Sequence, residues 1–274
     1  MSHSSENSDR MLSVATCHPT SLGTEDTTSK FGPFDIRTLE LSLSAGHRKL
    51  YGGKEGDEGE EAMVGEGQAT SFITGISHQN KHDVMNSTLL AQLSANAMFN
   101  RYSEPEKWYE YYRFVLENLG WVVTGFVFTE QSLQDIAVSV DKIVLDFLQT
   151  YLDPTQLSTI ERVISALKNK EDPAVKIFRS AASDSHQANF QIGCCEEDEN
   201  ENVSFSIGCF AYSTSDNITN ALFANLHKAN AKFQNAFQTM TLNTQVYALI
   251  REKVIAKLAE NAENLIDKLV ISRH

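Results

Sequence analysis

The chain has 274 residues, 41% of them apolar, which is enough to bury one large core or two modest ones. Its 36 acidic and 23 basic residues give a formal net charge of −13, and this acidic balance opposes binding to phosphate backbones or anionic lipid. The basic residues are scattered singly rather than gathered in a stripe, so we expect no nucleic-acid partner.

The first 30 residues (1–30) are rich in Ser, Thr, Asn, Asp and Glu, which predicts a disordered tail. They lack the basic and apolar regions of a secretory signal, and no stretch of the chain approaches the roughly 18 consecutive apolar residues of a spanning helix. We therefore expect a cytoplasmic protein. The four cysteines are too few for a disulfide scaffold, and we expect reduced thiols at Cys17, Cys194, Cys195 and Cys209.

Ordered structure is expected from residue 31 onward, as a single α+β globular domain over residues 31–274. Leu39, Leu41 and Leu43 alternate with polar residues, which predicts a half-buried strand. Residues 52–68 follow, rich in glycine and acidic side chains with almost nothing to bury. This composition predicts a mobile acidic loop.

Two helices are predicted next. Met85–Phe99 has leucines at helical spacing, with Asn86 or Ser87 as its N-cap. The second helix begins at Pro105, because proline suits the first turn, and it ends at Gly120. This helix and the segment after it contain both tryptophans of the chain, so we expect the folding centre here.

A strand, a hairpin and three helices are predicted in the middle of the chain. Trp121–Phe128 has large side chains on both faces, which predicts a central strand paired in a hairpin with Asp135–Val140. Asp141–Tyr151 shows helical periodicity. Asp153-Pro154 and Asp172-Pro173 each supply an N-cap followed by proline at the first helical position, and they predict two further helices.

The clearest strand signals are Ala188–Cys195 and Val203–Tyr212, in which apolar and small or polar residues alternate. The acidic stretch between them cannot be buried, so it predicts the solvated tip of a hairpin. We expect the apolar faces of both strands to line one core, which would set Cys194 opposite Cys209.

The pattern near the end of the chain is less uniform. Ile218–Asn243 fits a helix and a strand equally well, whereas Thr244–Leu269 has a broad apolar stripe that predicts a long C-terminal helix. Together the elements predict an α+β fold: a mostly antiparallel sheet packed against several helices, which we expect on one face.

Two stretches resemble ligand-binding loops but lack a required residue. Gly52-Gly53-Lys54 lacks the Ser or Thr that follows the lysine of a phosphate-binding loop. Asp198, Asn200 and Asn202 have the spacing of the first EF-hand ligands, but Val203 stands where the sharp turn needs glycine. Neither stretch predicts a nucleotide or calcium site.

A pair of histidines is the remaining candidate. His78 and His82 are four residues apart, which on a helix would place both imidazoles within reach of one metal ion, and Asp83 could add an oxygen. Residues 77–83 have the composition of a polar loop, however, and this favours exposed histidines. We assign no catalytic, cofactor-binding or metal-ligating residue, and we expect no cofactor.

Strong fold signals without chemical motifs favour a soluble, non-enzymatic protein that binds a protein partner or assembles with itself. Two alternatives stay open. The alternating hairpin of residues 188–212 suits a membrane-active or toxin-like protein released without a signal peptide, but its acidic tip opposes insertion, so a membrane partner is not favoured. The second alternative is an enzyme of a class without short motifs, which a deep pocket with convergent titratable groups would favour.

Overall fold

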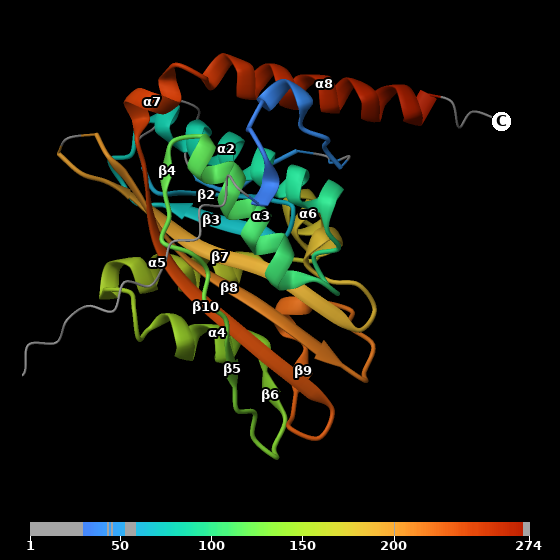
Figure 1. Cartoon of the computed structure of the whole chain (residues 1–274). Coiled ribbons are helices and arrows are strands. Elements are labelled where there is room, and N and C mark those ends of the chain that lie inside the picture. Colours follow the sequence, from blue (N-terminus) through green and yellow to red (C-terminus); the bar gives the residue numbers. More distant parts are fainter. Residues whose placement is uncertain (1–29, 43, 45, 53–58, 200, 271–274) are drawn as a thin grey trace, which may run out of the picture.

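A mixed sheet of eight strands forms the middle of the molecule (Figure 1). The structure is a computed structural model, and it describes residues 30–42, 44, 46–52, 59–199 and 201–270. The strand order is β1-β2-β3-β7-β8-β10-β4, with β5 also paired with β10, and the pair β3–β7 is parallel while the others are antiparallel. The strands are β1 (Arg48–Tyr51), β2 (Glu61–Gly65), β3 (Gln68–Phe72), β4 (Trp121–Val122), β5 (Thr129–Gln131), β7 (Gln187–Glu197), β8 (Val203–Thr214) and β10 (Ala231–Leu242). The predicted α+β class with a mostly antiparallel sheet is confirmed.

The helices of the described chain are α2 (His78–Met98), α3 (Pro105–Asn118), α4 (Val140–Leu148), α5 (Pro154–Ala166), α6 (Pro173–Ala182), α7 (Thr244–Ala248) and α8 (Arg251–Val270). Two 3₁₀ turns, η1 (Ile36–Thr38) and η2 (Ala221–Phe223), and a small sheet of β6 (Val138–Ser139) and β9 (Asn225–Leu226) complete the fold. The predicted helix starts at Pro105, Pro154 and Pro173 are confirmed. Asp153 caps α5 and Asp172 caps α6 because each carboxylate accepts hydrogen bonds from backbone N–H groups of the first turn.

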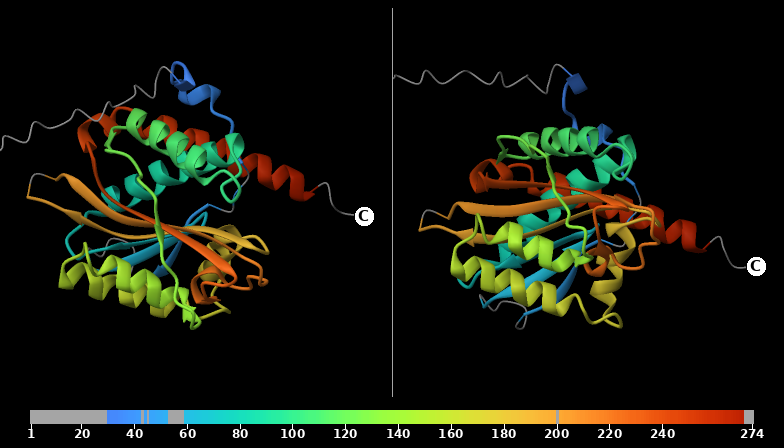
Figure 2. Two further views of the ribbon diagram at one scale, coloured as in Figure 1. Left: turned by 60° about the horizontal axis from the view of Figure 1, so that its bottom comes forward. Right: turned by 90° about the horizontal axis from the view of Figure 1, so that it is seen from below.

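Helices cover both faces of the sheet, so the expectation of helices on one face is wrong (Figure 2). The core between the sheet and α2, α3 and α8 contains Trp108, Trp121 and Phe205. The core on the other face, under α4, α5 and α6, contains Phe190 and Phe210. The small residues that alternate along β8 do not face solvent, because they allow a helix to pack closely: a Cβ on Gly208 would lie 2.7 Å from Leu148 of α4.

The hairpin of β7 and β8 is confirmed, but its predicted register is wrong. Glu197 pairs with Val203, so Gln191 lies opposite Cys209 and Cys194 opposite Ser206. The partner of Cys209 is thus three residues from the predicted one, and any odd difference in register turns a side chain to the other face. The residues that were expected to share one core are therefore divided: Phe190, Ile192 and Cys194 of β7 face one core, and Val203, Phe205, Ile207 and Cys209 of β8 face the other.

The prediction of a mobile loop over residues 52–68 is wrong for the second half of that range. Strands β2 and β3 occupy most of residues 61–72, and all of their residues are buried. Burial is tolerated because the carboxylate of Glu61 pairs with Lys49 at 2.8 Å and with the buried Lys81 at 3.4 Å. Residues 53–58 of this loop, and residues 1–29 of the predicted tail, lie outside the described residues.

The central strand predicted at Trp121–Phe128 is also wrong. Its first two residues form β4 at the edge of the sheet, and the predicted hairpin is replaced by pairing of β4 and β5 with β10. Trp121 is buried, but Val122 is 67% exposed and Val127 is 77% exposed. Large apolar residues on both faces of this segment misled the prediction, because two of them, Val122 and Val127, face solvent at the edge.

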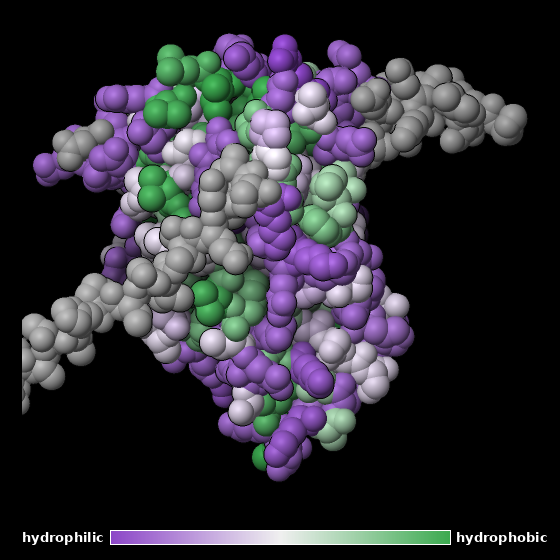
Figure 3. Space-filling view, viewed as in Figure 1, coloured by the Kyte–Doolittle hydropathy of each residue, from purple (hydrophilic) through white to green (hydrophobic). Residues whose placement is uncertain are grey.

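Three smaller differences concern the ends of the chain. The strand predicted around Leu39–Leu43 is a 3₁₀ turn followed by an irregular segment; Leu43 itself lies outside the described residues. The ambiguous segment Ile218–Asn243 contains the long strand β10. The last segment is divided into α7 and α8, and apolar side chains over α7 are exposed (Figure 3), with Leu249 just after it 82% exposed.

Candidate functional site

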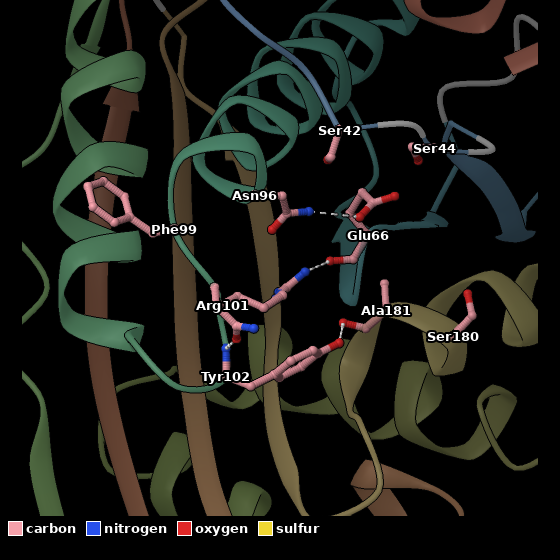
Figure 4. A pocket seen from close by; sticks show the side chains of 10 residues that line it. Ser42, Ser44, Glu66, Asn96, Phe99, Arg101, Tyr102, Ser180 and Ala181 are labelled. Atoms are coloured by element: carbon pink, nitrogen blue, oxygen red, sulfur yellow. Dashed lines mark hydrogen bonds between the residues drawn. The ribbon is translucent and has the colours of Figure 1, made fainter. Parts of the chain in front are cut away.

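A polar hollow of about 430 Å³ opens where the end of α2, the turn between β2 and β3, and the end of α6 meet (Figure 4). Polar side chains form most of its wall, so it suits a polar ligand rather than an apolar one. The residues that line it are Ser42, Ser44, Glu66, Asn96, Phe99, Asn100, Arg101, Tyr102, Ser180 and Ala181.

The turn that places Glu66 in this hollow requires left-handed backbone at two residues. Glu66 has φ 46° and Gly67 has φ 73°, which is the pattern of a type I′ turn between two antiparallel strands. Gly67 also has no room for a side chain, because a Cβ there would lie 2.8 Å from the carbonyl oxygen of Ala181. Glutamate is unfavourable at positive φ by about 1 kcal/mol or more, so its presence is a local strain beside the hollow.

Arg101 lies in the loop after α2, and only 5% of its surface is exposed. Its Nη1 donates a 2.7 Å hydrogen bond to the backbone oxygen of Glu66, and its guanidinium stacks over the ring of Trp108 at 4.8 Å. The backbone oxygen of Arg101 accepts a hydrogen bond from Asn189 of β7 at 2.7 Å. The backbone of Arg101 is thus tied to β7, whereas one hydrogen bond and one ring contact hold the charged group.

The Nε–Nη2 edge of Arg101 is buried and has no hydrogen-bond partner among the described residues. The same edge is used elsewhere in the chain to hold a carboxylate with two parallel bonds. Arg251 binds Asp83 in this way at 2.8 and 2.6 Å, and Arg37 binds Asp35 at 3.0 and 2.7 Å. The edge that Arg101 leaves unpartnered is therefore the one with the geometry to bind a carboxylate.

The groups around Arg101 do not neutralise its charge. Burial raises the pKa of Tyr109 and of Tyr112 well above the ordinary phenol value, and it raises the pKa of the Cys209 thiol to about 12. These three groups are uncharged at pH 7. Within the described part of the chain, no carboxylate forms an ion pair with Arg101.

A seam of buried amides and hydroxyls continues from this site along the sheet. Gln92 of α2 donates to the side-chain oxygens of Gln68 at 3.2 Å and Gln191 at 2.9 Å, which ties the helix to β3 and β7. The hydroxyl of Tyr112 has no partner in the ranges that the structure describes. The seam is rich in hydrogen-bond donors, in keeping with an acceptor as ligand.

The other polar residues of the hollow hold its shape. Asn96 accepts from Trp108 Nε1 at 2.8 Å and donates to Glu66 Oε2 at 3.1 Å, so both ends of its amide are used. Tyr102 donates to the oxygen of Ala181 at 3.1 Å, and burial raises its pKa. Arg101 and Glu66 are consequently the charged groups of this hollow, and neither was singled out by the sequence.

The structure places the candidate histidines on a helix rather than in a loop. Ser77 caps α2, so His78 and His82 lie in its first two turns, with their Nε2 atoms 3.2 Å apart. Asp83 is turned away from this pair toward Arg251. Over the described ranges, no three His, Cys, Asp or Glu side chains form a group that could hold a metal ion.

The remaining candidates have structural surroundings. Asp198 accepts from the backbone N–H of Asn202 at 2.9 Å within the hairpin tip, and Asn200 lies outside the described residues. Cys194, Cys195 and Cys209 are free and buried. None of the helices in the described part of the chain is long and apolar enough to cross a membrane.

No known protein family matches the sequence, and no curated protein matches it. Among solved structures, the activated Cyt2Ba monomer from Bacillus thuringiensis subsp. israelensis is similar over 49% of this chain and 79% of its own, with 14% identity and a TM-score of 0.31. The Evf virulence factor is similar over 72% of this chain and 82% of its own, with 13% identity and a TM-score of 0.31. Similarities of this size assign neither fold nor function to the chain.

Proposed function

We propose that the protein acts by binding a protein partner, and that the hollow beside Arg101 receives a carboxylate from that partner. The observation that carries the proposal is the buried Nε–Nη2 edge of Arg101, which lacks a partner among the described residues. An uncompensated buried charge is costly, and proteins retain such costs mainly where function requires them.

A single carboxylate fits the surroundings better than a phosphate does. Glu66 lines the same hollow, and the whole chain has a net charge of −13, so a doubly charged group meets more repulsion than a singly charged one. The flat carboxylate also matches two parallel N–H bonds, as Asp83 does with Arg251.

Binding requires the guanidinium to turn toward the hollow, because Nε and Nη2 are covered in the present arrangement. The movement breaks the hydrogen bond from Nη1 to the backbone oxygen of Glu66 and the contact with the ring of Trp108, each of which contributes on the order of 1 kcal/mol. A buried bidentate ion pair can offset this loss, because close charge pairs in protein complexes have coupling energies of about 1.5–7 kcal/mol.

The test is a titration of the full chain with acetyl-glutamate N-methylamide, followed by the ¹H–¹⁵N signal of the Arg101 Nε–H group. We expect this signal to move with saturation, and we expect Arg101→Gln to abolish a rise in melting temperature caused by the same compound. Arg162→Gln is the matched control, because Arg162 is an exposed arginine that pairs with Glu60 on another part of the surface.

Three further results decide the proposal. An unmoved Arg101 signal at saturating carboxylate would refute it, and so would an equal response of wild type and Arg101→Gln. A larger response to inorganic phosphate would reject the assignment of a carboxylate. Light scattering identifies the kind of partner: a complex that falls to 30.5 kDa only in Arg101→Gln is a second copy of the chain.

A further inference from the structure

We propose that His78 and His82 together bind a divalent transition-metal ion, such as Zn²⁺ or Ni²⁺. The pair lies in the first two turns of α2, at the opposite end of that helix from the hollow. The inference is independent of the proposed function, because it rests on other residues.

The distance between the two imidazoles fits one metal ion. Their Nε2 atoms are 3.2 Å apart, and the rings are 4.4 Å apart between centroids. With metal–nitrogen bonds of about 2.0–2.1 Å, this separation corresponds to an N–metal–N angle of about 100°, between the tetrahedral and octahedral values. A rotation of the rings that turns both Nε2 lone pairs from each other toward one ion would complete this geometry.

The helix fixes this geometry before metal binds. Ser77 caps α2 by accepting from the N–H of Asn80, and Glu197 of β7 accepts from the N–H of Ser77 at 3.1 Å. The first turn is therefore tied to the sheet, and the two histidines at positions i and i+4 share one face. Pre-ordering of both ligands removes part of the entropic cost of binding.

The neighbouring charges do not oppose a cation. Lys81 is buried and pairs with Glu61, so its charge is compensated. The carboxylate of Asp83 is held by Arg251 and by Gln79, at 3.0 Å for the latter, and it does not compete for the ion. His47 lies beside the pair, its ring 6.0 Å from that of His82, and its buried Nδ1 has no hydrogen-bond partner among the described residues.

Within the described ranges, no third His, Cys, Asp or Glu side chain joins the two imidazoles, so water or a ligand from outside would complete the coordination of the ion. Imidazole nitrogens favour Zn²⁺, Ni²⁺ and Cu²⁺ over Mg²⁺ and Ca²⁺, which prefer oxygen. We therefore expect binding of the first group and none of the second. Binding also requires both Nε2 atoms to be unprotonated, which distinguishes it from the present contact, in which one Nε2–H donates to the other Nε2.

The experiment is a calorimetric titration of the metal-free full chain with Zn²⁺, repeated for His78→Gln and His82→Gln. Each variant should bind one ion fewer than the wild type, because cysteines and histidines elsewhere contribute equally to all three. His186→Gln, which replaces a histidine remote from the pair in sequence and fold, is the control and should keep the wild-type stoichiometry.

A second readout separates ligation from a structural effect of the substitutions. In the wild-type chain, Zn²⁺ should shift the ¹⁵N resonances of Nε2 in both histidines, and Mg²⁺ should leave them in place. Unmoved resonances with saturating Zn²⁺ would overturn the proposal. Wild-type stoichiometry in either glutamine variant would overturn it as well.

Discussion

Two arginine side chains flank helix α2 at its opposite ends, and they differ in their partners. Near the start of the helix, Arg251 of α8 binds Asp83, whose side chain is fully buried, through two hydrogen bonds. Beyond the other end, the same edge of the Arg101 guanidinium is buried without a partner among the described residues. Arg101 is packed on the ring of Trp108, so what it lacks is a counter-charge rather than packing.

The comparison separates a structural arginine from a binding one. At the Asp83 end the chain supplies its own counter-charge, and the pair attaches α8 to α2. At the Arg101 end the seam of amides and hydroxyls supplies donors, and the nearby phenols and thiol stay neutral. A protein that needed Arg101 only for stability would gain from an apolar side chain of the same length.

The largest loss of stability is expected from a change at Trp121, which is bound to the first half of α2. Trp121 packs against Phe205 and donates a 3.0 Å hydrogen bond to Ser87 of α2. Trp121→Ala should lower the free energy of unfolding by about 3–5 kcal/mol, because it leaves a cavity and removes the hydrogen bond to Ser87. Urea denaturation measures the loss. A urea unfolding curve that coincides with that of the wild type would show that Trp121 does not stabilise the core beside α2.

A smaller effect is expected from the hairpin tip. Glu197 accepts from the N–H of Ser77 and from Asn80 at 2.9 Å, so it holds the N-terminus of α2. Glu197→Ser should cost about 1–2 kcal/mol. Glu199→Ser, at an exposed position of the same tip, is the control and should leave the unfolding curve unchanged. Equal losses in both variants would contradict the assigned role of Glu197.

The smallest effect concerns the reactivity of the three buried cysteine thiols. Burial raises the pKa of Cys194 and of Cys209 to about 12 and raises that of Cys195 strongly, so at pH 8 each thiol stays protonated and unreactive. The variant Cys17→Ser removes the thiol outside the described residues. A disulfide reagent should label the remaining cysteines of this variant only as fast as local or global unfolding exposes them. Rapid labelling of the folded protein at pH 8 would show that these cysteines are accessible.

Local signals predicted the local parts of the fold. Asp153 and Asp172, each followed by proline, gave helix starts that depend only on adjacent residues, and alternation along β7 and β8 gave their hairpin. The β2–β3 hairpin was missed because Glu61 is an acidic residue that is buried by pairing with Lys81, 20 residues away. The face that each of these strands turns to each core, and the register of their pairing, depended on the second layer of helices, and no single segment of the sequence indicates that layer.

The candidate site could not be predicted for a similar reason. Arg101 stands in a polar loop sequence, and its meaning depends on which carboxylates the fold brings near it. The Glu66-Gly67 turn carried a weak hairpin signal, but it was hidden by the acidic residues before it. The histidine pair was recognised by its spacing, and its interpretation as loop residues was wrong because Ser77, rather than Asn86 or Ser87, caps the helix.

The most direct test of the comparison is the free energy of unfolding, by urea denaturation, of Arg251→Met beside Arg101→Met. Arg251→Met should lose about 3 kcal/mol or more, because Asp83 keeps a buried charge without its counter-ion. Arg101→Met should be as stable as the wild type or more stable by up to about 2 kcal/mol, because it removes an uncompensated buried charge. A loss in Arg101→Met as large as that in Arg251→Met would show that Arg101 is needed for the fold and would contradict its assignment to binding.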